Sequence, residues 1–130
     1  MKQLKIGIFG AGRGCDIAEN FRLLGCDITA LCDFHPDRLA AAKERLGGDI
    51  TTYADFDTFI EHDMDAVVLA NYANEHAPFA IKAMKLGRHV FSEVLPVQTI
   101  KEAVELIETV EETGLVYAYG ENYCYMPGPW

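Results

Sequence analysis

The chain has 130 residues, and 50% of them are apolar, which is enough for a single domain with a buried core. A net charge of -9 and a pI near 4.8 argue against nucleic acid or an anionic membrane surface as a partner. No apolar run approaches the roughly 20 residues that cross a bilayer, and the N-terminus lacks the pattern of a signal peptide, so we expect a cytoplasmic location and no membrane partner.

The first apolar run of the chain, residues 4–9, ends in a glycine-rich turn. Three glycines follow within five positions, namely Gly10, Gly12 and Gly14. In residues 16–24, apolar side chains then recur at helical spacing, at Ile17, Phe21 and Leu24. This pattern predicts a strand, a glycine turn and a helix whose apolar face includes Leu24.

Such a turn brings backbone N–H groups and the positive end of a helix to one point, which suits a diphosphate. Gly10 would permit the tight turn, and Gly12 would let the phosphates approach the backbone next to Arg13. The third position of the dinucleotide fingerprint falls on Cys15, which is small enough for close helix packing, while Gly14 lies one place earlier. The alternative is that this turn is only a tight connection.

The next apolar run, residues 28–32, ends in Asp33. This acid follows Gly12 by about 20 residues, the offset at which a carboxylate accepts a ribose hydroxyl of a dinucleotide. A carboxylate there would repel the 2'-phosphate of NADP, so we expect NAD as the cofactor. Arg38 lies close enough in sequence to keep NADP as the less favoured alternative, although it could also be a solvated charge at the start of a helix.

Residues 36–60 carry the signals of structural elements rather than of a site. Pro36 suits a first helical turn, and the helix that follows should bury one stripe and end at Gly47. That stripe consists of Leu39, Ala42 and Leu46. Residues 49–53 form a short strand candidate, and Asp55 should cap a brief helix carrying Phe56, Phe59 and Ile60.

Residues 65–70 form a nearly continuous apolar strand, as expected when helices cover both faces of a parallel sheet. The loop after this strand faces the glycine turn in a doubly wound sheet. The polar residues of that loop are therefore candidates to line the nicotinamide half of a dinucleotide; they are Asn71, Tyr72, Asn74 and His76. Alternatively, Asn74 caps the following helix, and His76 is a first-turn histidine with satisfied hydrogen bonds.

The following strand, residues 89–92, ends in Glu93, whose carboxylate lies in the right layer for site chemistry or else accepts N–H groups of the next loop. Thr99 and Glu102 form a capping box. The helix that they start should bury a stripe at Ile100, Ala103, Ile107 and Val110. Residues 115–119 form the last strand candidate.

Six strands that alternate with five helical segments indicate an α/β fold. We expect a doubly wound, mostly parallel sheet of the Rossmann type, with strand order 3-2-1-4-5-6 and helices on both faces.

The motifs taken together resemble the N-terminal domain of the Gfo/Idh/MocA family of nicotinamide-dependent oxidoreductases. The likeness covers essentially the whole chain, and its most specific part is the run 83–93, in which a Gly-x-His-Val sequence precedes Glu93. The resemblance implies that residues 1–119 bind NAD(P). It also implies that residues 120–130 start the connection to a C-terminal domain outside this chain, which holds a small-molecule substrate such as a sugar or cyclitol.

The sequence departs from the family pattern at two places. The family motif Glu-Lys-Pro puts a lysine, often the general acid or base, after the glutamate, but here Val94 follows Glu93. Asn122 matches a family asparagine, whereas Cys124 falls where many members have arginine. The catalytic residue is therefore unknown, with His76 and Tyr123 as candidate bases. A family branch with Glu-Val at this motif includes glycosidases that use NAD in a transient oxidation.

Three functions follow as alternatives for the whole protein. The first is an NAD-dependent oxidoreductase acting on a sugar, cyclitol or similar hydroxyl compound. The second is a non-catalytic NAD-binding or interaction module, and the third is an NAD-dependent glycoside hydrolase. We expect the 130-residue chain alone to bind NAD without turnover.

The aromatic tail of the chain, residues 117–130, is expected to pair with a second copy when nothing else covers it. The four cysteines and four histidines show no metal-ligand spacing, so we expect no metal site.

Overall fold

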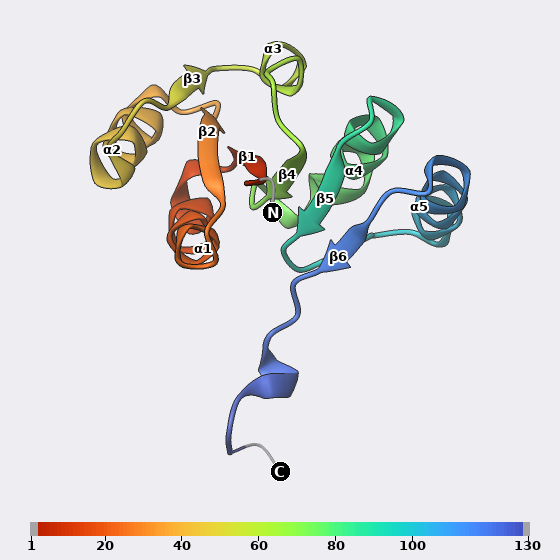
Figure 1. Ribbon diagram of the computed structural model, residues 1–130. Helices are drawn as coiled ribbons and strands as arrows, with labels where there is room; N and C mark the ends of the chain where they lie inside the picture. The colour runs from red at the N-terminus through yellow and green to blue at the C-terminus, as the bar shows by residue number, and fades with distance from the viewer. Residues whose placement is uncertain (1–2, 129–130) are drawn as a thin grey trace.

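A computed structural model describes residues 3–128, which form alternating strands and helices (Figure 1). The strands are β1 (Lys5–Phe9), β2 (Asp27–Cys32), β3 (Thr51–Tyr53), β4 (Ala66–Leu69), β5 (His89–Ser92) and β6 (Tyr117–Tyr119). The α-helices are α1 (Ala11–Leu23), α2 (Pro36–Leu46), α3 (Phe56–Ile60), α4 (His76–Lys85) and α5 (Ile100–Thr113). Two short 3-10 helices, η1 (Ala73–Glu75) and η2 (Tyr123–Tyr125), lie in connecting segments.

The six strands form one sheet in the order β3-β2-β1-β4-β5-β6, and every neighbouring pair runs parallel. The predicted Rossmann order is therefore confirmed. The order reverses between β1 and β4, which lie side by side at the centre. Ligands of open parallel sheets bind outside the carboxyl ends of the strands at such a reversal. The loops after β1 and β4 are thus where a site is expected.

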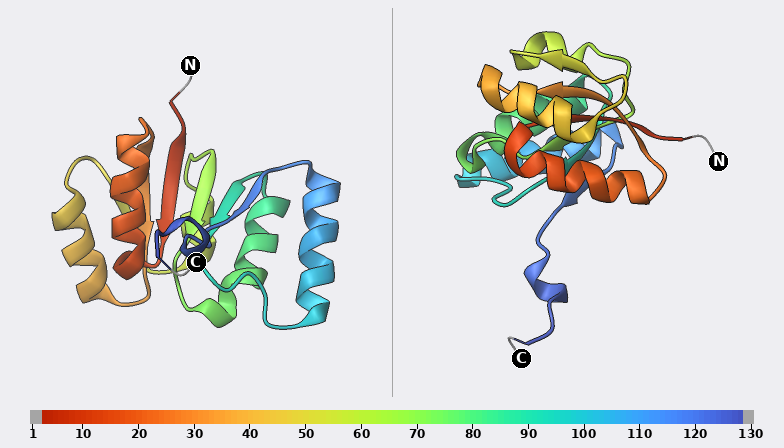
Figure 2. Two further views of the ribbon diagram at one scale, coloured as in Figure 1. Left: turned by 90° about the horizontal axis from the view of Figure 1, so that it is seen from below. Right: turned by 90° about the vertical axis from the view of Figure 1, so that its left-hand side faces the viewer.

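Each face of the sheet has its own buried core. On one face, Ile8 of β1 and Val68 of β4 pack with residues of α1 and α2. On the other face, the neighbouring side chains Phe9 and Leu69 pack with residues of α3, α4 and α5. The left view of Figure 2 shows α1 and α2 to one side of the strands and α4 and α5 to the other. Burial on both faces explains why the strands lack a polar alternation.

Helix α1 differs from its predicted bounds. It begins at Ala11, directly after Gly10, instead of at residue 16, because the Gly10 carbonyl already accepts the N–H of Gly14 at 3.1 Å. The helix ends at Leu23, so the predicted apolar face is wrong at Leu24, whose side chain lies past the helix and is 78% exposed. Apolar spacing alone cannot locate the start of a helix whose first turn contains glycines, because glycine contributes no apolar side chain to the pattern.

Helix α5 has the predicted capping box, with Thr99 and Glu102 bonded reciprocally, but only part of its predicted stripe faces the core. Ala103 and Val110 are half-buried, and Val110 packs against the core. Ile100 and Ile107, predicted to be buried, are 85% and 58% exposed. The buried residues are Leu106 and Thr109. The Thr109 hydroxyl donates to the carbonyl of Glu105 at 2.7 Å, so this polar side chain is buried with its hydrogen bond satisfied. A pattern that counts only apolar residues therefore misses it.

Other local signals are confirmed. Pro36 begins α2, Gly47 follows its end, and the Asp55 side chain accepts the Thr58 N–H at the start of α3. None of the helices within residues 3–128 is both long enough and apolar enough to span a bilayer.

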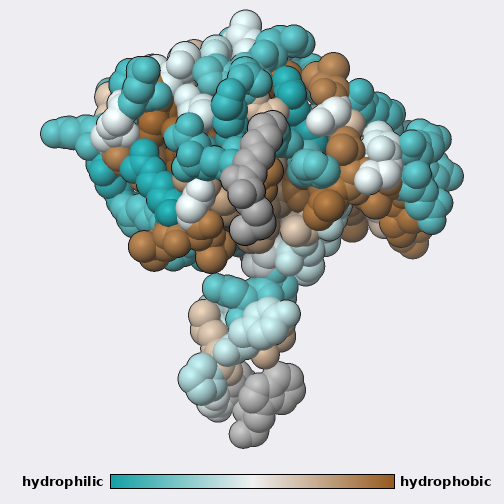
Figure 3. Space-filling model, in the orientation of Figure 1, coloured by the Kyte–Doolittle hydropathy of each residue, from teal (hydrophilic) through white to brown (hydrophobic). Residues whose placement is uncertain are grey.

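The segment after β6 leaves the sheet and stands away from the rest of the molecule (Figures 1 and 3). Its tyrosines Tyr123 and Tyr125 are 70% and 86% exposed. The final two residues of the predicted connection 120–130, including Trp130 of the aromatic tail, lie outside the described residues.

Candidate functional site

The turn between β1 and α1 depends on Gly10 for two reasons. Its φ of 97° is in a region that side chains rarely adopt. A Cβ at this position would also lie 2.3 Å from the carbonyl oxygen of Ala70, at the end of β4. Gly10 therefore lets the loop after β1 pass directly against the loop after β4, which sets the floor of the crevice between them.

The other two glycines of the turn have different surroundings. A Cβ on Gly12 would meet nothing within 4 Å, so the backbone there is open to an approaching group. A Cβ on Gly14 would lie 2.5 Å from Cγ2 of Ile8, so Gly14 permits close packing of α1 on β1. Cys15, for which close helix packing was predicted, is also buried in the core cluster that contains Ile8, and its thiol donates to the Ala11 carbonyl at 2.9 Å.

Asp33 follows β2 and is only 7% exposed. Its Oδ2 accepts the N–H of Ala11 at 2.8 Å, and its Oδ1 accepts the N–H of His35 at the same distance. The carboxylate thus holds the loop after β2 against the first residue of α1. An ionised carboxylate has about four lone-pair positions, so further donors can still approach it.

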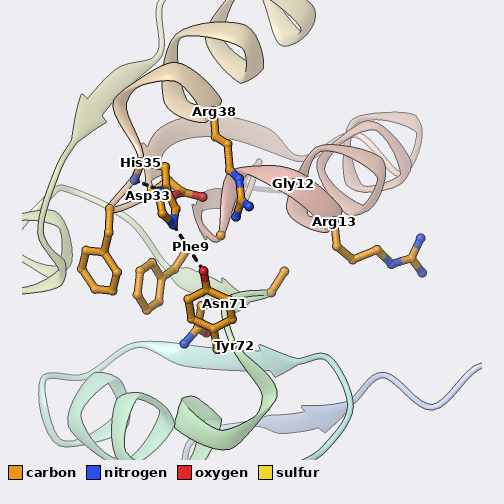
Figure 4. Close-up of a pocket in the computed structure, with 11 residues that line it drawn as sticks. Phe9, Gly12, Arg13, Asp33, His35, Arg38, Asn71 and Tyr72 are labelled. Carbon is orange, nitrogen blue, oxygen red and sulfur yellow. Dashed lines mark hydrogen bonds between the residues drawn. The ribbon is translucent and has the colours of Figure 1, made fainter.

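A pocket connects Asp33 with the glycine turn (Figure 4). It is lined by Phe9, Gly10, Gly12, Arg13, Asp33, Phe34, His35, Arg38, Ala70, Asn71 and Tyr72. The sequence did not single out Phe9, Phe34, His35 or Ala70. The rings of Phe9 and Phe34 pack edge to face with their centroids 5.4 Å apart, so one side of the pocket is aromatic. The position of His35, directly before the helix that follows Asp33, is the signal that could have found it.

Asn71 and Tyr72 line the same pocket as Asp33. They therefore lie beside the residue predicted for the adenosine ribose. The Asn71 Nδ2 donates to Glu75 at 3.4 Å, and the Tyr72 hydroxyl lies 3.3 Å from Nε2 of His35. Tyr72 is 53% exposed, so its ring stands at the mouth of the pocket.

Asn74 and His76, the other two residues of this loop, do not line that pocket. Asn74 is exposed within η1 and caps neither η1 nor α4, so the capping alternative is wrong. His76 is 1% exposed, with Nδ1 2.9 Å from the Leu95 carbonyl and Nε2 3.3 Å from the Asn71 carbonyl. This buried ring joins the loops after β4 and β5.

Glu93, directly after β5, pairs with Arg13 across the crevice, with Nε of the arginine 2.8 Å from Oε1 of the acid. The Glu93 side chain is 15% exposed, and the hydrogen bond to this carboxylate raises the pKa of Arg13 above its ordinary value. A second pocket surrounds the pair. It is lined by Arg13, Glu93, Val94, Glu121, Asn122, Tyr123 and Met126. Arg13 thus belongs to both pockets, and Glu93, Asn122 and Tyr123, each a candidate from the sequence, line the same pocket.

This geometry agrees with the comparison to known proteins. The family model of the Gfo/Idh/MocA proteins, described as an oxidoreductase family with an NAD-binding Rossmann fold, matches residues 4–121. The chain belongs to this family. The Gfo/Idh/MocA model covers the glycine turn, Asp33 and the residues of both pockets up to Glu121, so these residues belong to an NAD-binding domain.

Proteins similar to this chain include glycosyl hydrolases and dehydrogenases. "Glycosyl hydrolase family 109 protein 2" of Shewanella sp. strain ANA-3 is 35% identical over 96% of this chain. A scyllo-inositol dehydrogenase structure from Lactobacillus casei with bound NAD(H) and scyllo-inositol has a TM-score of 0.86 at 28% identity over 97% of this chain. GenD2 from gentamicin A biosynthesis, solved with NAD, has a TM-score of 0.89 at 26% identity over 98%.

The chain spans 30% of the length of the Shewanella relative, 38% of the inositol dehydrogenase and 37% of GenD2. Within residues 3–128, no group of three or more His, Cys, Asp or Glu side chains is arranged to hold a metal ion.

Proposed function

We propose that the crevice between the loops after β1, β2 and β4 holds NAD, with the diphosphate at the start of α1 and the adenosine ribose on Asp33. The observation that carries this placement is the open backbone at Gly12, where a Cβ would meet nothing within 4 Å, next to the buried carboxylate of Asp33. The N–H groups of a helix N-terminus favour a diphosphate at this point. A negative charge at Asp33 disfavours the additional phosphate of NADP.

The nicotinamide half is assigned to the second pocket, where Glu93 and Asn122 meet. Arg13 lies between the two pockets and holds the Glu93 carboxylate at 2.8 Å. When bound, NAD would supply a hydride acceptor for the oxidation of a substrate carbon that carries a hydroxyl group. The residues of this pocket would fix the orientation of the ring and exclude water from it.

A base must take the proton of that hydroxyl group. Of the two candidates from the sequence, His76 has both ring nitrogens directed at backbone carbonyls. Tyr123 lines the second pocket, and its hydroxyl has no partner within residues 3–128. We therefore assign His76 to holding the two loops together and retain Tyr123 as the candidate base.

For the whole protein, we propose an NAD-dependent oxidoreductase that acts on a sugar, cyclitol or similar hydroxyl compound. Support comes from the family and from the inositol dehydrogenase, which was solved with NAD(H) and scyllo-inositol. Because the chain spans about a third of the length of these proteins, a second domain that follows residues 120–130 would hold the substrate. The 130-residue chain alone would then bind NAD without turnover.

A glycoside hydrolase that uses NAD is the second candidate. Two observations favour it: Val94 stands where the family lysine is usual, and relatives at up to 35% identity are named glycosyl hydrolase family 109 proteins. The two candidates share the NAD site and differ in what happens to the substrate after oxidation.

The test uses the complete gene product with nitrophenyl glycosides and with polyols such as inositols, each with and without NAD. Reduction of NAD by a polyol without release of nitrophenol supports the dehydrogenase. Release of nitrophenol that requires NAD supports the hydrolase. If neither reaction occurs although NAD binds, both are rejected and the non-catalytic module remains.

A further inference from the structure

Two side chains bridge the crevice at its adenosine end. Nε2 of His35, from the loop after β2, lies 3.3 Å from the hydroxyl of Tyr72, from the loop after β4 (Figure 4). Figure 4 shows the two side chains directed toward each other across the pocket that Asp33 and Gly12 also line. The bridge therefore connects two loops that meet at no other side-chain hydrogen bond within residues 3–128.

The bridge is a weak interaction between two well-held loops. It is long and exposed, whereas the His35 backbone N–H is fixed by Asp33 Oδ1 at 2.8 Å. On the other side, the loop that carries Tyr72 runs into His76, whose buried ring lies with Nδ1 2.9 Å from the Leu95 carbonyl. A long exposed hydrogen bond contributes little to stability, so the bridge can open while the loops that carry it stay in place.

The surroundings of the bridge suit a flat aromatic group. Phe34 is 46% exposed and Tyr72 is 53% exposed, and both line the pocket, so two rings present their surfaces to solvent at its mouth. Exposed rings that face a common space bind nucleobases by stacking. The carboxylate of Asp33, at the base of the same pocket, marks the ribose side.

We propose that the His35–Tyr72 hydrogen bond closes the nucleobase subsite, that the adenine half of the cofactor opens it, and that the freed Tyr72 ring then stacks on the base. This inference rests on the proposed function, because it assigns the adenine half to this pocket. It assigns the Tyr72 ring to binding of the base on the adenosine side, and it assigns His35 to holding Tyr72 in the closed bridge. The closed bridge slows entry of the cofactor, and the ring strengthens its binding.

The role of the bridge and the role of the ring are separated by two substitutions. Tyr72→Phe removes the hydroxyl and keeps the ring, so NADH should associate about twofold to tenfold faster, the range that corresponds to one weak hydrogen bond. Tyr72→Ala removes both, so the affinity should fall about tenfold, within the range measured for loss of one base–aromatic stack. Tyr125→Ala is the matched control, because Tyr125 is an 86% exposed tyrosine outside both pockets.

Stopped-flow measurements with NADH give the association rate, and calorimetry gives the affinities for NAD, for ADP as the adenine half and for nicotinamide mononucleotide as the other half. We expect Tyr72→Ala to weaken NAD and ADP equally and to leave the mononucleotide unchanged. An unchanged association rate in Tyr72→Phe, or equal affinities for ADP in Tyr72→Ala and the unaltered chain, would overturn the inference while leaving NAD binding intact. If the unaltered chain binds neither NAD nor ADP, the proposed function itself fails.

Discussion

The carboxylate of Asp33 accepts the backbone N–H of Ala11 at 2.8 Å, which joins the end of β2 to the first residue of α1. The same carboxylate accepts the N–H of His35, so one buried acid fixes the loop after β2 and ties it to the start of α1. Asp33 is therefore a structural residue as well as the proposed ribose ligand, and its two roles can be measured separately.

Replacing Asp33 with alanine should lower both stability and NAD affinity. The buried N–H of Ala11 and the half-buried N–H of His35 would lose their acceptor, which costs about 1–3 kcal/mol of unfolding free energy. Loss of the bond to the ribose should weaken NAD by a further 1–2 kcal/mol or so, the scale of a hydrogen bond to a charged group. Denaturant unfolding and calorimetry measure the two effects. Asp33→Asn is the control: one oxygen remains as acceptor, so its stability should lie between those of the other two chains.

Gly12→Ala should separate cofactor binding from folding. The new methyl group meets nothing within 4 Å in the structure, and alanine is favoured over glycine in a helix by about 1 kcal/mol, so the unfolding free energy should hold or rise. NAD affinity should fall about tenfold, because an extra methyl at a close contact costs about 1–3 kcal/mol. Calorimetry measures the NAD affinity, and denaturant unfolding measures the unfolding free energy.

Gly10→Ala is the matched comparison for that experiment. Its positive φ and the 2.3 Å approach to the Ala70 oxygen predict a loss of stability of at least about 1–3 kcal/mol from backbone strain alone. If Gly12→Ala binds NAD as tightly as the unaltered chain, the diphosphate does not lie at this turn.

Gly14→Ala should be destabilised through its contact with β1. The added Cβ would lie 2.5 Å from Cγ2 of Ile8, and such overpacking costs about 1–3 kcal/mol. Shortening Ile8 to alanine removes the clashing atom. The double variant should therefore be more stable than the sum of the two single changes predicts, by about 0.5–3 kcal/mol in a double-mutant cycle. Strict additivity would show that α1 shifts to accommodate the methyl group.

The role of Gly14 illustrates what the sequence could and could not predict. The helix caps at Asp55 and Thr99 follow from short-range patterns, the strand order follows from the fold class that the alternating elements indicate, and the structure confirms both. Which glycine packs on β1 depends on the angle at which α1 leaves the turn, a property of three dimensions. Spacing in the fingerprint pointed to Cys15, which is buried in the same core, but it could not show that Gly14 makes the tighter approach to Ile8.

The candidate site was predictable to a similar extent. Residues at the ends of strands were found because the fold brings those ends to one edge of the sheet. How they divide between two pockets was not predictable, since it depends on loop conformation: Tyr72 turns toward His35, whereas His76, only four positions later, is buried between two carbonyl groups.

The exposure of Ile100 and Ile107 in α5 was also not predictable. Apolar residues at helical spacing form more than one stripe on this helix, and spacing alone does not tell which stripe meets the core.

The cysteines should differ sharply in reactivity. Burial raises the pKa of Cys32 to about 12 and also raises the pKa of Cys15, whereas Cys124 is exposed. Because the thiolate is the reactive form and a raised pKa reduces its share at any given pH, Cys15 and Cys32 should stay unmodified by Ellman's reagent between about pH 7 and 9. Cys124 should react at once, and the buried pair only after unfolding. Rapid modification of Cys32 in the folded chain would contradict its burial.

Calorimetry of the unaltered chain with NAD and with NADP tests the central claim most directly, because it asks whether the glycine turn and Asp33 form a dinucleotide site with the assigned preference. The account predicts that NAD binds and that NADP binds more weakly. Tighter binding of NADP would show that Arg38 rather than Asp33 sets the preference, and absence of heat with both cofactors would contradict the site itself.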